Sequence, residues 1–593
     1  MRRLAILALL GMHVVSGVYA MRPPSLKWWI ADSLQKITPG ESAPPQLLKR
    51  ADIFAARNEF EPFQLVLHAD NEDAGGVDIR CSDLRSVGGE KISSANITIY
   101  AEQFLDVTRP SLASGTPGLW PDALIPRIDR YANERRNAFP LVVRRSRNQP
   151  LWIEVYVPET ALPGKYDGVV SILRGEAVES TVPVHLTVWA FTLPSTATLK
   201  SSFGLNGTAI LKQHLGSYTS DEDLYRLTEL YAKAALLHRI SIYGGSMVPP
   251  KYQYAGGHVR VDWVPYDREV GPFLNGTVLG AGPLHGARAT SVDLRTPAAF
   301  DTDQQRSLYL AEWVKHFREK GWADRLFLYL WDEPSPADFP KVVTKGLASL
   351  AADSGIRNLV TVPFNAKLDP VVQIWVPLMN CLERRPGYDD FCAEAPPLSA
   401  YYGQAEQGRS LWFYQSCASH GCNIAGGDYF SGWPSYMIDA PATANRVMQW
   451  VAWKYRIKGE LYYSMNEAYG QKDPWTDIRL FGGNGDGTLF YPGRPSRIGG
   501  RTDIPIESIR LKLIREGMED YEYLALLAKL EGQSAADEYA DRIVQKPWLW
   551  ESRPEVFLGV RRELGETLNR LATGRPVGER PAGERAAGEN DAQ

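Results

Sequence analysis

Two adjacent carboxylates, Asp332 and Glu333, follow directly on an apolar, aromatic-rich run of strand type that ends at Trp331, and Pro334 follows them. This order predicts that the acids lie where a buried strand emerges into a loop, which is where α/β barrels keep their catalytic groups. Consecutive residues on a strand face opposite ways, so both acids could meet one ligand only if the backbone bends between them. Pro334 favours such a bend.

Cleavage of a glycosidic bond is a reaction that this pair could support. It requires a carboxylic acid to protonate the leaving oxygen, and a second group to stabilise or trap the oxocarbenium-like centre. Glu333 suits the first role, because a neighbouring like charge favours the protonated form of a carboxyl group. Asp332 is covalently adjacent and cannot easily act as a nucleophile about 5 Å away across the sugar ring. It could instead orient a group of the substrate. A helix cap or a loop acid pair without a catalytic role is the other interpretation.

The composition is that of a globular protein with several domains. The chain has 593 residues, 44% hydrophobic and 23% charged, which is too long for a single core. Its 17 Trp and 28 Tyr can fill large cores, and flat aromatic faces also suit the C–H faces of sugar rings. A net charge of −4 shows no basic excess, so nucleic acid is not an expected partner.

Residues 1–20 are typical of a signal peptide. Arg2 and Arg3 precede an apolar run, and Val18-Tyr19-Ala20 fits the pattern before a signal-peptidase cut. No later segment is long and apolar enough to cross a bilayer. We therefore expect an exported protein of the periplasm or the medium, with an uncleaved membrane anchor as the alternative.

Five cysteines are too few to create the fold, but they could form local disulfides. In an oxidising compartment Cys417 could pair with Cys422 and Cys381 with Cys392, which would leave Cys81 unpaired. A metal site is not favoured, because the cysteines are not in close pairs with nearby His and there is no His-Glu-x-x-His helix.

Residues 21–197 are predicted to form a β-sandwich. Short strands with alternating apolar residues are separated by Gly, Pro and Asn turns, and no helical period of comparable strength occurs. The alternating residues are Phe63, Leu65 and Leu67; Leu151, Ile153, Val155 and Val157; and Val182, Val184, Leu186 and Val188.

Residues 198–500 are predicted to form a (β/α)8-type TIM barrel, because strands there alternate with amphipathic helices. Ser220 is an expected helix cap, and Thr302 with Gln305 has the spacing of a capping box. Strands are expected at 238–243, 326–331, 358–362 and 460–465, and helices near 339–353 and 442–457.

The remaining chain divides into a helical region, 501–572, and a tail, 573–593. Pro505 is expected to be the first residue of a long helix whose buried face carries Ile509 and Leu513. The tail is a degenerate five-residue repeat that has nothing to bury, so we expect it to be disordered.

Several segments are similar to one enzyme family. Tyr329-Leu-Trp331-Asp332-Glu333-Pro334 resembles the catalytic motif of glycoside hydrolase family 123, whose members are β-N-acetylgalactosaminidases. The segment Asn484-Gly-Asp486-Gly-Thr-Leu-Phe-Tyr491-Pro492-Gly493 and the helical segment 505–524 resemble the domain of unknown function that accompanies this family. Segments 56–64 and 151–158 resemble the N-terminal domain of the family.

This resemblance implies substrate-assisted hydrolysis of a glycan that contains N-acetylhexosamine. Glu333 would be the general acid and later the base. Asp332 would position the acetamido group and stabilise the oxazolinium ion. No metal or organic cofactor is implied.

Six further residues are candidates for sugar contacts, through aromatic stacking or hydrogen bonds to hydroxyls. They are Tyr329, Trp331, Tyr463, Asn466, Glu467 and Trp475. Core filling and loop satisfaction are the alternative for each. The Asn484–Gly487 segment lacks the ligand spacing of an EF-hand, so we expect a Gly-rich turn near the barrel mouth. We expect Arg510 and Arg515 to tie the C-terminal helix to the barrel through ion pairs.

The leading hypothesis is therefore an exported glycosidase that removes terminal β-linked N-acetylhexosamine, with N-acetylgalactosamine as the expected sugar. One alternative is a retaining glycosidase with Glu333 as acid/base and Glu467 as nucleophile. The other is a non-catalytic carbohydrate-binding envelope protein.

Overall fold

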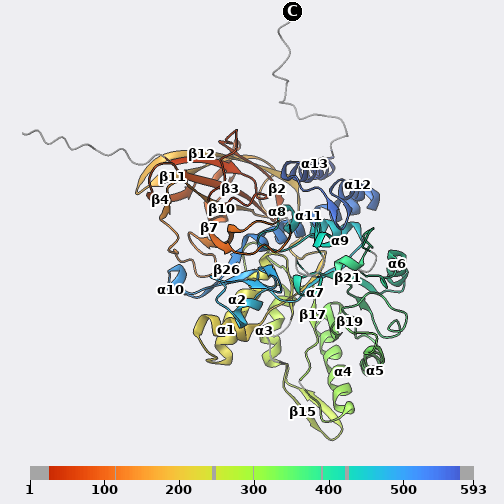
Figure 1. Cartoon of the computed structure of the whole chain (residues 1–593). Coiled ribbons are helices and arrows are strands. Elements are labelled where there is room, and N and C mark those ends of the chain that lie inside the picture. The colour runs from red at the N-terminus through yellow and green to blue at the C-terminus, as the bar shows by residue number, and fades with distance from the viewer. Residues whose placement is uncertain are drawn as a thin grey trace, which may run out of the picture.

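The computed structural model describes residues 26–113, 115–243, 249–297, 299–388, 392–420, 422 and 427–574. Figure 1 shows the N-terminal strands together with the C-terminal helices α12 and α13 on one side of the molecule, and helices α1 to α5 on the other. The expected signal peptide and most of the expected tail lie outside the described residues.

The N-terminal region is a β-sandwich, as predicted. One sheet has the order β1-β3-β10-β7-β8-β26-β25, and all its neighbours are antiparallel. Its strands are β1 (Leu26–Ala31), β3 (Glu59–Ala69), β10 (Arg147–Val157), β7 (Ile97–Val107), β8 (Gly118–Pro126), β26 (Ile504–Ser508) and β25 (Phe490–Gly493). The last two come from the far end of the chain, so the C-terminal region completes an N-terminal sheet.

The second sheet has the order β2-β12-β11-β4-β9, with β5 and β6 beside β11. Its strands are β2 (Ala51–Arg57), β12 (Ala177–Thr192), β11 (Gly164–Arg174), β4 (Ala74–Cys81), β9 (Leu141–Val143), β5 (Leu84–Ser86) and β6 (Lys91–Ile92). All the alternating apolar residues noted in the sequence are buried in the one core between these sheets. Because side chains of a strand alternate between its faces, the period of two identified the buried face correctly.

The central region is a nearly closed parallel barrel with the strand order β14-β13-β22-β21-β20-β19-β18-β17. Its strands are β14 (Ile242–Tyr243), β13 (Lys200–Gly204), β22 (Gly459–Tyr462), β21 (Ser410–Tyr414), β20 (Ile374–Trp375), β19 (Asn358–Val360), β18 (Leu326–Trp331) and β17 (Val292–Asp293). At the seam between β14 and β17, the Ser241 hydroxyl accepts a hydrogen bond from the Thr290 amide (2.6 Å) and lies 2.9 Å from the Thr290 hydroxyl. Side chains thus join the two ends of the sheet.

Two helices of the barrel begin where the sequence places their caps. The Ser220 hydroxyl accepts from Asp223 N (3.1 Å), and the Thr302 hydroxyl accepts from Gln305 N (3.2 Å). The helices are α1 (Gly207–Leu215), α2 (Asp221–Leu237), α3 (Val264–Asn275), α4 (Asp303–Glu319), α5 (Phe339–Ala352), α6 (Leu398–Glu406), α7 (Cys417–His420), α8 (Ala442–Arg446) and α9 (Met448–Lys454). The expected helix 442–457 is thus divided in two. Short elements between them are the hairpin β15 (Tyr252–Ala255) and β16 (His258–Val261), the pair β23 (Arg479–Leu480) and β24 (Gly483–Asn484), and helix α10 (Pro495–Ile498).

The C-terminal region is helical after residue 508. It comprises α11 (Ile509–Glu531), α12 (Gln533–Ile543), the short strands β27 (Val544–Lys546) and β28 (Leu549–Trp550), and α13 (Pro554–Thr573). The expected start of the long helix at Pro505 is wrong, because Pro505 lies in β26 and pairs with Pro492. The Ser508 hydroxyl caps α11 by accepting from Leu511 N at 3.1 Å. Residues 505–508, which we expected in the helix, instead belong to β26, because they pair with neighbouring strands.

The structure contains both disulfides that the sequence suggested, Cys381–Cys392 and Cys417–Cys422, and leaves Cys81 as a free thiol. Among the described residues, no helix is long and apolar enough to span a membrane.

Candidate active site

The two acids stand at the carboxyl end of β18, where the backbone turns sharply. Glu333 has a φ of +42°, in the left-handed region that few non-glycine residues adopt. This is the bend that the adjacent acids require, and both carboxylates line the same cavity. Both residues are exposed, whereas Pro334 is buried. Strain of this kind persists where the surrounding structure holds it, and such positions concentrate at functional sites.

Thr361, which follows β19, holds the bend. Its hydroxyl accepts a hydrogen bond from Glu333 N (2.7 Å) and donates one to Asp332 Oδ1 (2.9 Å). The Tyr329 hydroxyl donates to the same Asp332 oxygen at 2.7 Å. In the described part of the chain no protein group bonds Asp332 Oδ2. One oxygen of Asp332 is thus fixed by protein and the other is open to a ligand.

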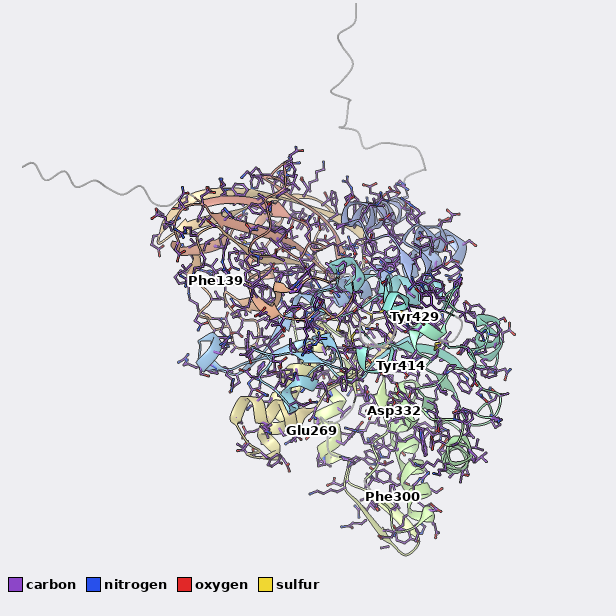
Figure 2. The ribbon with its side chains drawn as sticks, in the orientation of Figure 1. Phe139, Glu269, Phe300, Asp332, Tyr414 and Tyr429 are labelled. Carbon is purple, nitrogen blue, oxygen red and sulfur yellow. A yellow bond between two sulfur atoms is a disulfide. The ribbon has the colours of Figure 1, made fainter. Side chains whose placement is uncertain are left out.

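Glu333 is bonded from the opposite wall by Tyr414, the last residue of β21. The Tyr414 hydroxyl donates to Glu333 Oε1 at 2.7 Å. Burial raises the pKa of Tyr414 above its ordinary value, and the neighbouring negative charge of Glu333 raises it further. The phenol therefore stays protonated and acts as a donor. Figure 2 places Asp332 and Tyr414 close together in the lower part of the molecule.

The cavity around these groups has a volume of about 680 Å³. It is lined by Tyr243, Asp293, Leu294, Arg295, Thr296, Leu328, Tyr329, Leu330, Trp331, Asp332, Glu333, Tyr414, Ala418, Ser419, Leu461, Tyr463, Glu467 and Phe481. Most of these residues lie at or just after the carboxyl ends of barrel strands, as the fold requires of a TIM-barrel site. The volume of the cavity, its aromatic side chains and its carboxylates are suited to binding a sugar, which stacks on aromatic rings and bonds through its hydroxyls.

The candidate residues divide into those that line the cavity and those that do not. Tyr463 and Glu467 line it beside the acids. Asn466 is buried instead, where its side-chain amide donates to Asn206 O at 3.0 Å. Trp475 is also buried, with its ring 5.1 Å from that of Tyr491 and its indole N–H donating to Pro492 O (3.0 Å). These last two support the surrounding loops in the structure.

Trp331 borders the cavity, but its ring is turned toward α5. The Lys345 ammonium lies 4.4 Å from the centre of the indole ring. A cation over the ring occupies a face that would otherwise be free for a sugar. Tyr329 points into the barrel and fixes Asp332 in the manner described above.

Thr361, Tyr414, Asp293 and Arg295 were not among the candidates from the sequence. Tyr414 ends a strand, as Tyr329 and Tyr463 nearly do, so a systematic search of strand ends could have found it. Asp293 ends a two-residue strand and Arg295 follows it closely, and two residues give too short a pattern to recognise a strand.

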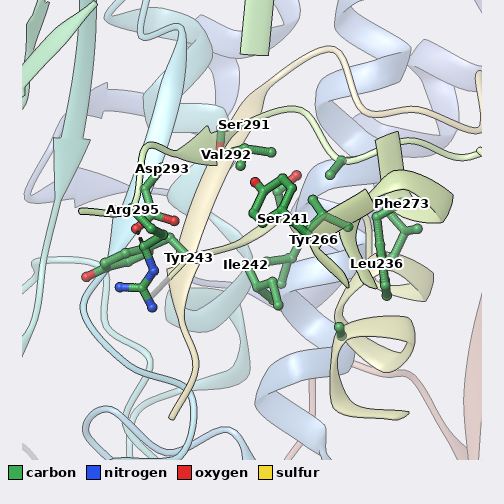
Figure 3. A pocket seen from close by; sticks show the side chains of 14 residues that line it. Leu236, Ser241, Ile242, Tyr243, Tyr266, Phe273, Ser291, Val292, Asp293 and Arg295 are labelled. Carbon is green, nitrogen blue, oxygen red and sulfur yellow. Dashed lines mark ion pairs between the residues drawn. The ribbon is translucent and has the colours of Figure 1, made fainter. Parts of the chain in front are cut away.

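Asp293 and Arg295 form an ion pair of 3.5 Å at the edge of the cavity, next to Tyr243 (Figure 3). A separate apolar cavity of about 40 Å³ extends behind them along the barrel seam, between β14, β17, α2 and α3. Arg295 is the one cationic side chain among the described residues that line the larger cavity, which otherwise carries Asp293, Asp332, Glu333 and Glu467 as charged groups.

The chain is similar to known glycoside hydrolases in both sequence and fold. Residues 301–527 match the family model "Glycoside hydrolase 123, catalytic domain", and residues 41–174 match "Glycoside hydrolase 123 N-terminal domain". Among solved structures, a family 123 glycoside hydrolase from Clostridium perfringens is similar over 93% of this chain and 99% of its own, with 14% identity and a TM-score of 0.65. At that identity the likeness shows a shared fold.

Two other solved structures are more distant. A GH5 xyloglucanase from Bacteroides ovatus has a TM-score of 0.27, with 10% identity over 84% of this chain and 100% of its own. A family 39 glycoside hydrolase from Bacteroides cellulosilyticus has a TM-score of 0.30, with 10% identity over 78% of this chain and 81% of its own. No curated protein matches the chain. Both characteristic domains are matched and the catalytic model includes the acids at the end of β18, so the chain belongs to glycoside hydrolase family 123.

Proposed function

We propose that this hydrolase removes terminal β-linked N-acetylhexosamine, with N-acetylgalactosamine as the preferred sugar, by substrate-assisted hydrolysis with retention. The observation that supports this most directly is the state of Asp332. One of its carboxylate oxygens is held by Tyr329 and Thr361, the other accepts no bond from the described residues, and the side chain lines the cavity that also contains Glu333. An acid fixed in this way beside the general acid suits the binding of an amide N–H better than attack across the ring.

In the proposed reaction Glu333 gives its proton to the glycosidic oxygen as the bond from that oxygen to the anomeric carbon breaks. The acetamido carbonyl oxygen of the substrate attacks the anomeric carbon and forms the oxazolinium ion. Asp332 accepts the amide N–H and its negative charge stabilises the cation. Glu333 then takes a proton from water, which opens the ring with a second inversion and so restores the original configuration.

A glycolipid or another glycoconjugate is the substrate class that we propose first. The similar protein from Clostridium perfringens is described in connection with glycolipid glycan hydrolysis. The cavity of about 680 Å³ has room for more than one sugar ring.

A second candidate function is a conventional retaining glycosidase, because Glu467 lines the same cavity as Glu333 from a different strand end. In that case Glu467 would be the nucleophile and would form the covalent glycosyl intermediate.

We also propose that the protein is exported to the periplasm or the medium. The basic and apolar residues 1–20 support this, and so do two disulfides, which persist in oxidising compartments.

The first test measures release of nitrophenol from β-N-acetylgalactosaminide, β-N-acetylglucosaminide and β-galactoside substrates. We expect activity on the acetamido sugars alone, and a fall in kcat of about 100-fold or more in both Asp332→Asn and Glu333→Gln. Glu467→Gln tests the alternative nucleophile, and we expect it to lose much less activity than either of these variants, because Gln can still bond sugar hydroxyls.

Each other outcome has a definite meaning. Cleavage of the plain galactoside together with loss of activity in Glu467→Gln would favour the two-carboxylate mechanism. A wild-type protein that binds these glycans without cleaving any of them would point to a carbohydrate-binding role instead.

A further inference from the structure

Asp486 lies outside the cavity but bonds both of its walls. It belongs to the loop between β24 and β25 and is fully buried. Its Oδ1 accepts from Cys417 N (3.2 Å) and its Oδ2 from Ala418 N (3.1 Å). The Tyr463 hydroxyl donates to Oδ2 at 3.2 Å, and the Tyr462 hydroxyl lies 3.4 Å from Oδ1.

The four donors come from two different strand ends. Cys417 and Ala418 begin the short helix α7, which closely follows β21, the strand that ends at Tyr414. Ala418 and Ser419 of this helix line the cavity. Tyr462 and Tyr463 come from the end of β22, and Tyr463 lines the cavity on that side. One carboxylate thus connects the wall that bonds Glu333 with the neighbouring wall.

The loop around Asp486 has little freedom to move. Gly487 has a φ of +62°, and a Cβ there would overlap the Tyr463 phenol. On the other side, Gly485 O accepts from Arg510 Nη1 at 2.9 Å. The loop is therefore held between Arg510 of α11 and the Tyr463 side chain.

None of the charged and titratable groups described around Asp486 forms an ion pair with it, so its carboxylate acts as a hydrogen-bond acceptor. The side chains that face it from β22 are phenols, Cys417 of α7 is in a disulfide, and Arg510 of α11 is paired with Asp122 at 2.8 Å. Burial raises the pKa of Asp486 to about 6, and the amides of Cys417 and Ala418 counteract that rise. Near neutral pH the carboxylate is ionised and can accept all four bonds.

We propose that Asp486 is a positioning residue of the hydrolase: by fixing helix α7 after β21 against the end of β22 it sets the placement of Tyr414, and through Tyr414 that of the general acid Glu333. The inference rests on the proposed role of Glu333. Displacement of a catalytic group by about 1 Å can lower a rate about 100-fold. A carboxylate that links two cavity walls would prevent such a displacement.

The test compares Asp486→Asn with wild type on two acetamido sugar substrates that differ only in the leaving group. Dinitrophenol departs with little protonation, whereas an unactivated phenol needs the general acid. We expect kcat to fall about 10- to 100-fold for the phenyl substrate and less than about 3-fold for the dinitrophenyl substrate. Equal losses on both substrates would indicate a general structural defect and would overturn the proposal.

Asp439→Asn is the matched control. Asp439 is also buried and accepts from Asn484 Nδ2 (3.1 Å), at the end of β24 where this loop begins, and from Ser111 N (2.6 Å), but it does not line the cavity. We expect its kcat for both leaving groups to stay within about 3-fold of wild type. A selective loss on the phenyl substrate in this variant as well would assign the effect to the loop in general and contradict a specific role for Asp486.

A geometric measurement separates this proposal from the proposed function. In a crystal structure of Asp486→Asn we expect the distance from the Tyr414 hydroxyl to Glu333 Oε1 to exceed hydrogen-bond length, against 2.7 Å in the wild type. An unchanged distance would overturn the positioning role, whatever sugar the enzyme cleaves. Failure of wild type on acetamido sugars, with the distance lengthened in the variant, would refute the proposed substrate alone.

Discussion

At the scale of single residues, the site depends on one unusual backbone angle and on one hydroxyl that holds it. The φ of +42° at Glu333 brings neighbouring acids onto one cavity. The buried Thr361 hydroxyl bonds both the amide of Glu333 and the carboxylate of Asp332. The strained turn at the acid pair is thus held by a side chain that directly follows the adjacent strand.

We therefore predict that Thr361→Val, which keeps the shape but removes the hydroxyl, lowers kcat about 10-fold or more. It should also lower the free energy of unfolding by about 1–3 kcal/mol, because a part-buried amide loses its acceptor. Steady-state kinetics and urea denaturation measure the two effects. Thr361→Ser retains the hydroxyl and should stay near wild type in both. Activity in Thr361→Val equal to that of wild type would refute the role assigned to this hydroxyl.

At the scale of elements, α11 is unusual because it is buried on nearly all sides. Its first sixteen residues are all buried, charged ones included. Arg510 and Arg515 form their ion pairs with Asp122 of β8 and Glu154 of β10, at 2.8 Å each. We had expected these pairs to reach the barrel, but they reach the sandwich, because β26 leads α11 directly out of that sheet. From the barrel side, main-chain carbonyls such as Gly485 O accept hydrogen bonds from Arg510.

Substitution by Ala should have opposite effects at two helical glycines, because Gly517 of α11 is packed closely against α8 and α9 whereas Gly559 of α13 has open space beside it. In Gly517→Ala the new Cβ would overlap Gln449 Oε1 and lie 2.7 Å from Arg446 O. We expect a loss of about 1–3 kcal/mol in unfolding free energy, in spite of the better helix propensity of Ala. In Gly559→Ala of α13 nothing lies within 4 Å of the new atom. That variant should gain about 0.5–1 kcal/mol.

Urea denaturation of both variants beside wild type measures the difference. A stabilised Gly517→Ala protein would show that α11 is packed less closely than the structure indicates.

At the scale of the whole molecule, buried ion pairs join the sandwich, the barrel and the helices. Glu154 of the sandwich accepts from Arg515 (2.8 Å) and Lys512 (3.1 Å) of α11, and from Arg130 (3.0 Å). Arg239, which follows α2 of the barrel, pairs with Glu519 of α11 at 3.3 Å. The expected division into a sandwich, a barrel and a helical region therefore describes the chain order better than the packing, in which α11 is a common core.

Removal of one charge from this network should be costly. Burial by itself would raise the pKa of Glu154, but the charges of Arg515, Lys512 and Arg130 outweigh it and hold the pKa well below its ordinary value. We predict that Glu154→Gln lowers the free energy of unfolding by about 3–5 kcal/mol at pH 7, because buried cations lose their partner. Glu176→Gln is the control: its pair with Arg80 is 88% exposed on the carboxylate side, and we expect a change within about 0.5 kcal/mol.

The pH dependence has a definite sign. A carboxyl group with a depressed folded-state pKa stabilises the protein at pH values above its unfolded-state pKa, which is about 4.5 for Glu. This stabilisation is lost as the pH falls from there toward the folded-state pKa. The difference between wild type and Glu154→Gln should therefore narrow below about pH 4.5. Denaturation series between pH 7 and pH 3 test this. A gap that widens on acidification would contradict the assigned charge state.

The local pattern of the sequence determined much of this protein. Alternating residues such as Leu151 and Ile153 marked the sandwich core, and Ser220 and Thr302 marked the helix starts. The position of Asp332 and Glu333 after an apolar run predicted two acids at a strand end. In each case the cause is local, since strand period, capping and chain bends involve residues only a few positions apart.

The tertiary structure alone decided how distant parts of the chain meet. Tyr414 is 81 positions from Glu333, and Asp486 is 69 from Cys417. β26 is a strand because β8 and β25 lie on either side of it, although the spacing of its own residues suggested a helix. No local period records such pairs, because they exist only after the barrel and the sandwich have packed against α11.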